Sequence, residues 1–406
     1  MRIRPNIIRH AWFWGAVLFS PGLAALEGLT ALSSGTNVYD QFENILPTRA
    51  PVISSCYRFC RGEPFQLYLA VSNPALKEGR AEVVADFRLR LPDGSERDIG
   101  SKIEIFSGKF PGGQVLSPVS LRTRMEADDP IGDYLVLITF TDRNDGSKVE
   151  KELKFRLTGD FQDDGTTMSI TDLENFLENY YQHPDPASIL PAFRGFISGE
   201  SALRRRGGRD FTPYSYLVAF ARLLELNPQL SDAFIRTVAK LPPGGCSHAA
   251  MVIAGSGEEN IRKMTPLLDS RTAHLLDSFG GKNPLEIATV SEAARIDALW
   301  REFTVTGRVE PVRKLVEELQ DRQMLDVEEV RSRGGRLTPE ERKMFSNYLL
   351  RALAFRTLSR NAPKHRLLYF YLEAMLARGE IPAGDARKMI EKIVADSAGD
   401  YSAGGK

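Results

Sequence analysis

The sequence predicts a chain of two domains, in which an antiparallel β-sandwich is followed by an α-helical domain. Its 406 residues exceed one small domain, because domains average roughly 100–200 residues. Apolar residues alternate with a period of two from 52 to 158, and they recur at spacings of three and four from 169 to 398. The chain is 42% hydrophobic, which suffices for real cores and argues against wholesale disorder.

The first 25 residues have the composition of a secretory signal peptide. Three arginines and His10 precede an apolar run over residues 11–19, and a Pro-Gly pair then breaks any helix. Small residues at Gly22 and Ala24 provide a cleavage site, and Ala25 offers a second one. The apolar run is shorter than the roughly 20 residues of a spanning helix, although an uncleaved membrane anchor is the alternative. We therefore expect a periplasmic or secreted protein whose mature chain has no transmembrane span.

Residues 26–51 are mixed in composition and rich in small or polar types, which favours a linker or a loosely docked segment. Two alternating runs follow, over 65–71 and 83–91, and each predicts a strand with one buried face. The segment Leu91–Ser95 contains Pro and Gly and predicts a turn. The β domain is expected to span residues 52–158.

The clearest hairpin lies between residues 129 and 157. An apolar run over 134–140 leads to the turn sequence Asn144–Ser147, and a second run returns over 149–157 with charged residues at most alternate positions. Short strands joined by turns, with no helices between them, favour an antiparallel sandwich.

The stretch Asp-Pro-Ile-Gly-Asp-Tyr at 129–134, followed by a β run and a returning strand, resembles an immunoglobulin-like module of secreted bacterial proteins. In that family a Gly-x-Tyr stretch opens a late strand. The resemblance implies an immunoglobulin-like sandwich and carries no activity. The Cys…Trp…Cys core of antibody domains is absent, which excludes a standard antibody-type domain.

An acidic, glycine-containing linker is expected over 159–168, and the period is helical from there to residue 398. Capping residues and prolines open several short helices, and the longest is expected from Pro339 to about Arg360. Such a series predicts an α-solenoid or an irregular bundle, although no clean repeat period is visible. Residues 399–406 are expected to form a disordered tail.

Residues 297–307 read Asp-Ala-Leu-Trp-Arg-Glu-Phe-Thr-Val-Thr-Gly. They resemble a family of helical, tetratricopeptide-like proteins with the signature Asp-x-Leu-Trp-x-x-Phe-x-x-Thr-Gly, which are often exported and have no assigned activity. Leu299, Trp300 and Phe303 share one helix face with Ile296, and Gly307 is suited to a helix C-cap. The signature is therefore expected to be a packing element that carries no catalytic residue.

No motif of enzyme chemistry is present, so we predict no catalytic residue, no metal site and no cofactor. The sequence lacks a His-Glu-x-x-His pair, a Gly-x-Ser-x-Gly elbow and the glycine-rich loops that bind phosphates or dinucleotides. Cys246 and His248 are close in sequence, but residues two apart on a helix point to different faces. A Cys56–Cys60 disulfide is possible in an oxidising compartment, and the odd count leaves one thiol over.

Two basic stretches are candidate binding surfaces. The first is predicted to be a loop, and its candidate residues are Arg204, Arg205, Arg206 and Arg209. The second, at a helix junction, holds Arg356, Arg360, Lys364, His365 and Arg366. Either stretch suits an anionic glycan, a lipid head group or an acidic protein, while a solvated surface is the plain alternative.

Three functions are compatible with these observations. The one we favour is a non-enzymatic scaffold of the cell envelope that binds a protein or peptide through its helical domain. An envelope-polymer hydrolase with cryptic carboxylates is the second. The third is a carbohydrate-binding accessory protein, which needs an exposed aromatic platform such as Tyr57, Tyr68 and Phe110. The formal net charge of zero argues against nucleic acid as a partner, and the oligomeric state is left open.

Overall fold

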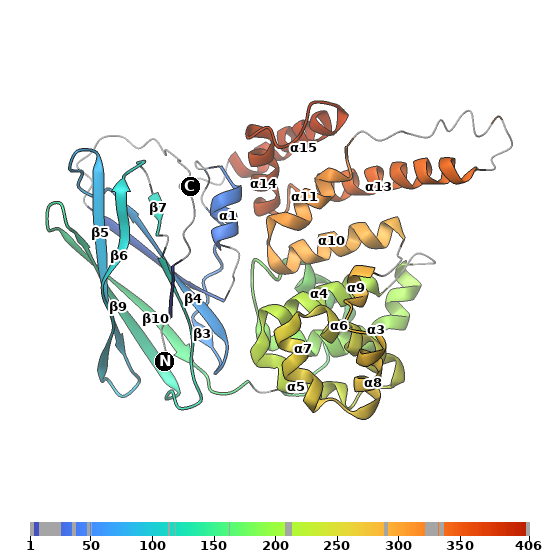
Figure 1. Cartoon of the computed structure of the whole chain (residues 1–406), viewed down its shortest axis with the longest axis horizontal. Coiled ribbons are helices and arrows are strands. Elements are labelled where there is room, and N and C mark those ends of the chain that lie inside the picture. Colours follow the sequence, from blue (N-terminus) through green and yellow to red (C-terminus); the bar gives the residue numbers. More distant parts are fainter. Residues whose placement is uncertain are drawn as a thin grey trace. The chain divides into compact units, whose positions relative to one another are not determined.

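The computed structural model describes residues 4–7, 26–34, 38–46, 49, 51–112, 114–117, 119–161, 163–207, 213–287, 291–320, 332 and 337–402. It divides into two compact units. The first comprises Met1–Asp163, Gln182–Pro186 and Asn227–Ala233, and the second comprises Asp164–Tyr181, Ala187–Leu226 and Phe234–Lys406. Strands build the first unit and helices the second (Figure 1). The predicted order of β structure followed by α structure is confirmed.

The first unit contains two five-stranded sheets. In one sheet the order is β1 (Arg4–Ile7), β8 (Val119–Arg124), β4 (Pro64–Ser72) and β2 (Glu27–Ser33), and β7 (Gln114–Leu116) also pairs with β4. In the other sheet the order is β3 (Arg58–Phe59), β10 (Lys148–Leu157), β9 (Gly132–Asp142), β5 (Arg80–Arg90) and β6 (Glu96–Lys109). All these pairs are antiparallel except β3 with β10.

The hairpin expected between residues 129 and 157 is present. Strands β9 and β10 pair without a break from Thr141 opposite Lys148 to Gly132 opposite Leu157. The intervening turn includes Gly146, whose φ of 78° lies in the left-handed region that glycine tolerates.

Both sheets contribute side chains to one shared core. Buried residues alternate along β9, as expected for a strand with one face on a core. Aromatic rings pack among the aliphatic side chains of this core; Tyr134 of β9 stacks on Phe155 of β10 with centroids 5.1 Å apart. Gly28 of β2 lies so close to Phe140 that an added Cβ would sit 2.3 Å from its ring.

The segment 26–51 differs from the expected linker. It contains β2, which pairs with β4 over seven residues, and the helix α1 (Val38–Asn44). Leu26 and Leu32 are buried in the shared core, so this segment is integral to the unit. Buried and exposed residues do not alternate strictly along β2. The sequence of this segment therefore lacks the period of two that predicts a strand.

Beyond residue 163 the described residues form 13 α-helices, whose bounds follow. They are α2 (Ile170–Asn179), α3 (Ile189–Gly207), α4 (Tyr214–Leu226), α5 (Ser231–Val238), α6 (Pro243–Gly255), α7 (Glu258–Met264), α8 (Ser270–Ser278), α9 (Pro284–Ile287), α10 (Glu292–Thr306), α11 (Val309–Glu317), α13 (Pro339–Asn361), α14 (Arg366–Ala377) and α15 (Asp385–Ser402). Because α15 continues to Ser402, the predicted disordered tail begins inside a helix, and residues 403–406 lie outside the described part. Among the described residues, no helix combines the length and apolar character needed to cross a bilayer.

Helix α10 carries the signature around Trp300, and packing agrees with the expectation from sequence. Ser291 caps its N-terminus by accepting the Ala294 N–H, and Gly307 ends it in the left-handed conformation with φ 63°. Ile296, Trp300 and Phe303 are buried. This helix contacts α2, α4 and α13. Its exposed residues therefore lie between α2 and α13.

Candidate functional site

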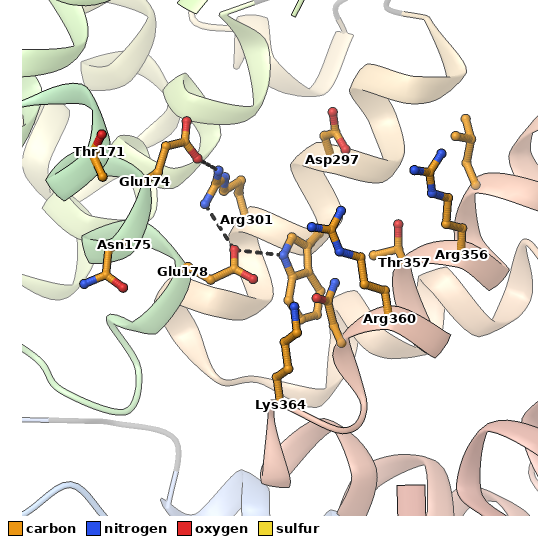
Figure 2. A pocket seen from close by; sticks show the side chains of 13 residues that line it. Thr171, Glu174, Asn175, Glu178, Asp297, Arg301, Arg356, Thr357, Arg360 and Lys364 are labelled. Carbon is orange, nitrogen blue, oxygen red and sulfur yellow. Dashed lines mark hydrogen bonds and ion pairs between the residues drawn. The ribbon is translucent and has the colours of Figure 1, made fainter. Parts of the chain in front are cut away.

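A pocket of about 670 Å³ opens in the helical unit where α2, α10 and the C-terminal half of α13 meet (Figure 2). Its lining is predominantly polar and charged. The charged residues among them are Glu174, Glu178, Asp297, Arg301, Arg356, Arg360 and Lys364. The remaining lining residues are Thr171, Asn175, Trp300, Leu353, Thr357 and Asn361.

Arg301 forms the centre of the pocket floor. Its side chain is only 13% exposed, and its two terminal nitrogens pair with Glu174 and, at 3.3 Å, with Glu178 (Figure 2). The guanidinium also lies over the ring of Tyr216, 5.4 Å from the centroid, and the Tyr216 hydroxyl donates to Glu174. Burial opposes the charge, but the carboxylates of Glu174 and Glu178 outweigh it and raise the pKa of Arg301. Arg301 is therefore a fixed cation whose charge is balanced by Glu174 and Glu178.

Glu178 connects this floor to α14. Its Oε2 accepts the Trp300 indole N–H at 3.2 Å, and its Oε1 lies 3.4 Å from His365 Nε2. The Tyr181 hydroxyl is 3.3 Å from His365 Nδ1, so a neutral imidazole can donate to Glu178 and accept from Tyr181. Burial would raise the pKa of Glu178, but the His365 hydrogen bond and the Arg301 charge outweigh it and lower that pKa.

Asp297 occupies the same pocket without such partners. Among the described residues no hydrogen bond or ion pair reaches its carboxylate. The concave surroundings remove the carboxylate partly from water and raise its pKa, although Arg301 lowers it and Glu174 adds to the rise. Glu178 and Asp297 thus have pKa values shifted in opposite directions within one pocket.

The opposite side of the pocket is basic. Arg356 and Arg360 are one helical turn apart on α13, and Lys364 follows four residues later in the turn that leads to α14. Figure 2 shows Arg356 and Arg360 across the pocket from Glu174. All three side chains are exposed, and in the described part of the chain no carboxylate pairs with them. We call Arg356, Arg360 and Lys364 the basic wall.

The candidate residues of the first basic stretch lie away from this pocket's lining. Arg204 and Arg205 are exposed on the last turns of α3 rather than in a loop, and Arg204 pairs with Glu200 at 2.9 Å. Arg206 belongs to the same helix, but its side chain and the whole of Arg209 lie outside the described residues. The second stretch is divided: three of its cations form the basic wall, whereas His365 is buried beneath the pocket.

The other groups weighed from sequence do not assemble into a reactive site. His248 Nδ1 lies 3.8 Å from Glu200, and its ring contacts Phe196 rather than Cys246. All three cysteines are free thiols, so the possible Cys56–Cys60 bridge is not formed. Among the described residues, no cluster of three His, Cys, Asp or Glu side chains is suited to a metal ion.

The three aromatics considered as a glycan platform do not form an exposed row. Tyr68 is 2% exposed, and its ring lies 5.6 Å from that of Tyr39. Phe110 packs edge-on against Phe106. Of the three, Tyr57 is exposed, and a single ring is not a platform.

Comparison with known proteins identifies no family for this chain. No family model matches it, and no curated protein matches it. One similar solved structure is a family 123 glycoside hydrolase from Clostridium perfringens, described for glycolipid glycan hydrolysis, with 9% identity and a TM-score of 0.20 over 44% of this chain and 36% of that chain. Another, named pT26-6p, has 11% identity and a TM-score of 0.17 over 71% of this chain and 49% of that one. At such scores these likenesses carry no weight for fold or function.

Sequence reasoning found the basic wall only as a charged stretch, and it missed the acidic side of the pocket. Glu174 and Glu178 come from α2, more than 120 residues before Arg301. One feature of the sequence could have indicated the acidic side. A buried Trp needs an acceptor for its indole N–H, and Asp297 and Arg301 lie beside the buried signature residues on α10.

Proposed function

We propose that this chain is an exported, non-enzymatic interaction protein that binds a protein or peptide partner through its helical unit. In this proposal the β unit is an immunoglobulin-like sandwich, and the helical unit is a tetratricopeptide-like, solenoid-like or irregular bundle. The observation that carries it is the pocket, where three cations without a carboxylate partner among the described residues lie beside Arg301 and its two paired glutamates.

Several features of the pocket favour binding over catalysis. Glu174 and Glu178 are held in ion pairs and hydrogen bonds, which leaves them poorly available as nucleophile or base. The described residues bring no thiol and no serine–histidine pair into the lining. In contrast, exposed arginines beside a concave surface are typical of sites that recognise charged groups on a partner.

The test is capture of partners from envelope extracts by immobilised protein. Wild type should retain a defined protein, and the double variant R356Q/R360Q should lose it, because the cations that recognise it are gone. R262Q/K263Q on α7 removes the same charge from an exposed site outside the pocket and should behave as wild type.

The variant R204Q/R205Q compares the pocket with the first basic stretch. Loss of the partner in R204Q/R205Q alone would assign binding to the end of α3 instead of the pocket. If all variants retain the partner as wild type does, neither the pocket nor the end of α3 is the binding site.

An envelope-polymer hydrolase remains the second candidate, and one observation favours it. Asp297 lines the pocket and its pKa is raised, as the general acid of a hydrolase requires. Release of reducing ends from purified envelope polymers by wild type, abolished in D297N, would establish this function; no release by wild type would exclude those polymers as substrates.

A further inference from the structure

The chemistry of the pocket also indicates which part of a partner it recognises. We propose that it binds a short, extended acidic peptide segment, whose carboxylates contact Arg356, Arg360 and Lys364 and whose backbone N–H groups face Asp297. This inference rests on the proposed function and adds the class of ligand to it.

The charge of Arg301 is already balanced, because its two terminal nitrogens pair with Glu174 and Glu178. The basic wall has no carboxylate partner in the described part of the chain. Arg356 and Arg360 present planar donor forks that match carboxylates, and Lys364 extends the same row by one more position.

The basic wall remains available because the carboxylates of α2 are already engaged. The nearby carboxylates of Glu174 and Glu178 are held by Arg301, Trp300 and Tyr216, which fixes them away from α13. If mobile carboxylates lay beside these exposed cations, the two would form ion pairs with each other. Here a ligand does not have to displace an existing ion pair to reach the basic wall.

Asp297 makes the pocket better suited to a peptide than to a simple anion. Asp297 is an unpaired acceptor within the same pocket, and it repels a ligand that carries only negative charge. A peptide offers both chemistries, since its acidic side chains accept from the arginines and its backbone N–H groups donate to a carboxylate. Asn175, Thr357 and Asn361 add neutral groups that can pair with a peptide backbone.

The size of the pocket agrees with a short segment. Its volume of about 670 Å³ lies within the roughly 300–1,000 Å³ that small-ligand pockets span. The pocket can therefore take a few residues rather than a folded surface, and two acidic side chains suffice to reach Arg356 and Arg360.

The experiment is fluorescence anisotropy with the full chain and two labelled, end-blocked octapeptides. One alternates Glu with Ala, and the other carries Gln at each Glu position. We expect wild type to bind the Glu peptide at least tenfold more tightly than the Gln peptide, with affinity falling as salt rises. R356Q/R360Q should lose at least tenfold for the Glu peptide, and R262Q/K263Q should stay within twofold of wild type.

The D297N variant tests the discrimination between peptide and simple anions. Wild type should bind inorganic phosphate and vesicles of phosphatidylglycerol more weakly than the Glu peptide, and D297N should narrow that gap by strengthening phosphate binding. Equal affinity for the Glu and Gln peptides would overturn the proposal. Tighter binding of phosphate or vesicles than of peptide would overturn it as well.

The outcomes also separate this inference from the proposed function. If R356Q/R360Q loses the envelope partner while wild type ignores the acidic peptide, the pocket binds a partner but the ligand class is wrong. If both measurements show no dependence on Arg356 and Arg360, the proposed function fails too.

Discussion

One half-buried and one buried carboxyl show how the surroundings of a single residue decide its chemistry. Glu178 and Glu63 both lose water on folding, yet their pKa values move in opposite directions. Glu178 meets Arg301, His365 and Trp300. Glu63 is 4% exposed; among the described residues it accepts only the Cys60 N–H at 3.0 Å and the Cys60 thiol at 3.4 Å, and its Oε1 has no hydrogen-bond partner there. Burial therefore dominates and raises the pKa of Glu63 to about 7.

This residue predicts a pH dependence of stability. The folded chain holds the Glu63 proton up to about pH 7, whereas the unfolded chain releases it near the ordinary glutamate pKa of 4.5. The stabilisation is thus complete below the unfolded pKa and is lost as pH rises through the folded one, by at most about 3 kcal/mol.

The check is denaturant unfolding at pH 5 and pH 8. The free energy of unfolding of wild type should fall from pH 5 to pH 8 as Glu63 ionises. That of E63Q should fall less, because glutamine carries no charge to bury. E104Q, at an exposed position of β6, should keep the wild-type dependence. An identical pH dependence in E63Q and wild type would contradict the role assigned to Glu63.

At the scale of the element, α10 decides the geometry of the pocket. The helix is fixed at its start by the Ser291 cap and at its end by Gly307. The Gly307 carbonyl accepts from the buried Tyr371 hydroxyl at 2.9 Å, which ties this end to α14. Since Asp297 and Arg301 lie on intervening turns, a shift at either end of α10 moves both side chains relative to α2 and α13.

We therefore expect G307A to destabilise the chain by about 1 kcal/mol, because a Cβ is disfavoured in the left-handed conformation. G244A is the matched control. Gly244 lies on the first turn of α6, an added Cβ there meets nothing within 4 Å, and alanine should be neutral or stabilising. Thermal unfolding of both variants provides the measurement. A loss in G244A as large as that in G307A would show that the helix end has no special role.

At the scale of the whole molecule, the chain divides into two compact units, and removal of a signal peptide would alter the first of them. Strand β1 (Arg4–Ile7) pairs with β8 over four residue pairs, and it lies within the predicted signal peptide. Cleavage after Ala24 or Ala25 would remove β1 and leave the other strands of its sheet, including β2, in place.

If the chain is exported as we propose, intact mass and N-terminal sequencing of protein from a periplasmic fraction should show a start at residue 25 or 26. Recovery of the protein only from cytoplasm, with Met1 retained, would reject the signal peptide and keep β1 in the sheet.

The order of the two domains, the β9–β10 hairpin, the long helix from Pro339 and the Gly307 helix end could all be predicted from sequence. These features are set by local patterns: a period of two or 3.6, a turn residue, a cap. Segment 26–51 was expected to be a linker or a loosely docked segment, and its strand β2 was missed because the pairing of β2 with β4 joins distant residues and leaves a weak local pattern.

For the pocket, the sequence alone determined that Arg356, Arg360 and Lys364 are close along the chain and charged. Only the tertiary structure decided that Glu174 and Glu178 neutralise Arg301 and leave that row of cations unpaired. The reason is physical: the strength of a charge–charge contact depends on distance and burial in space, and packing of α2, α10 and α13 sets both.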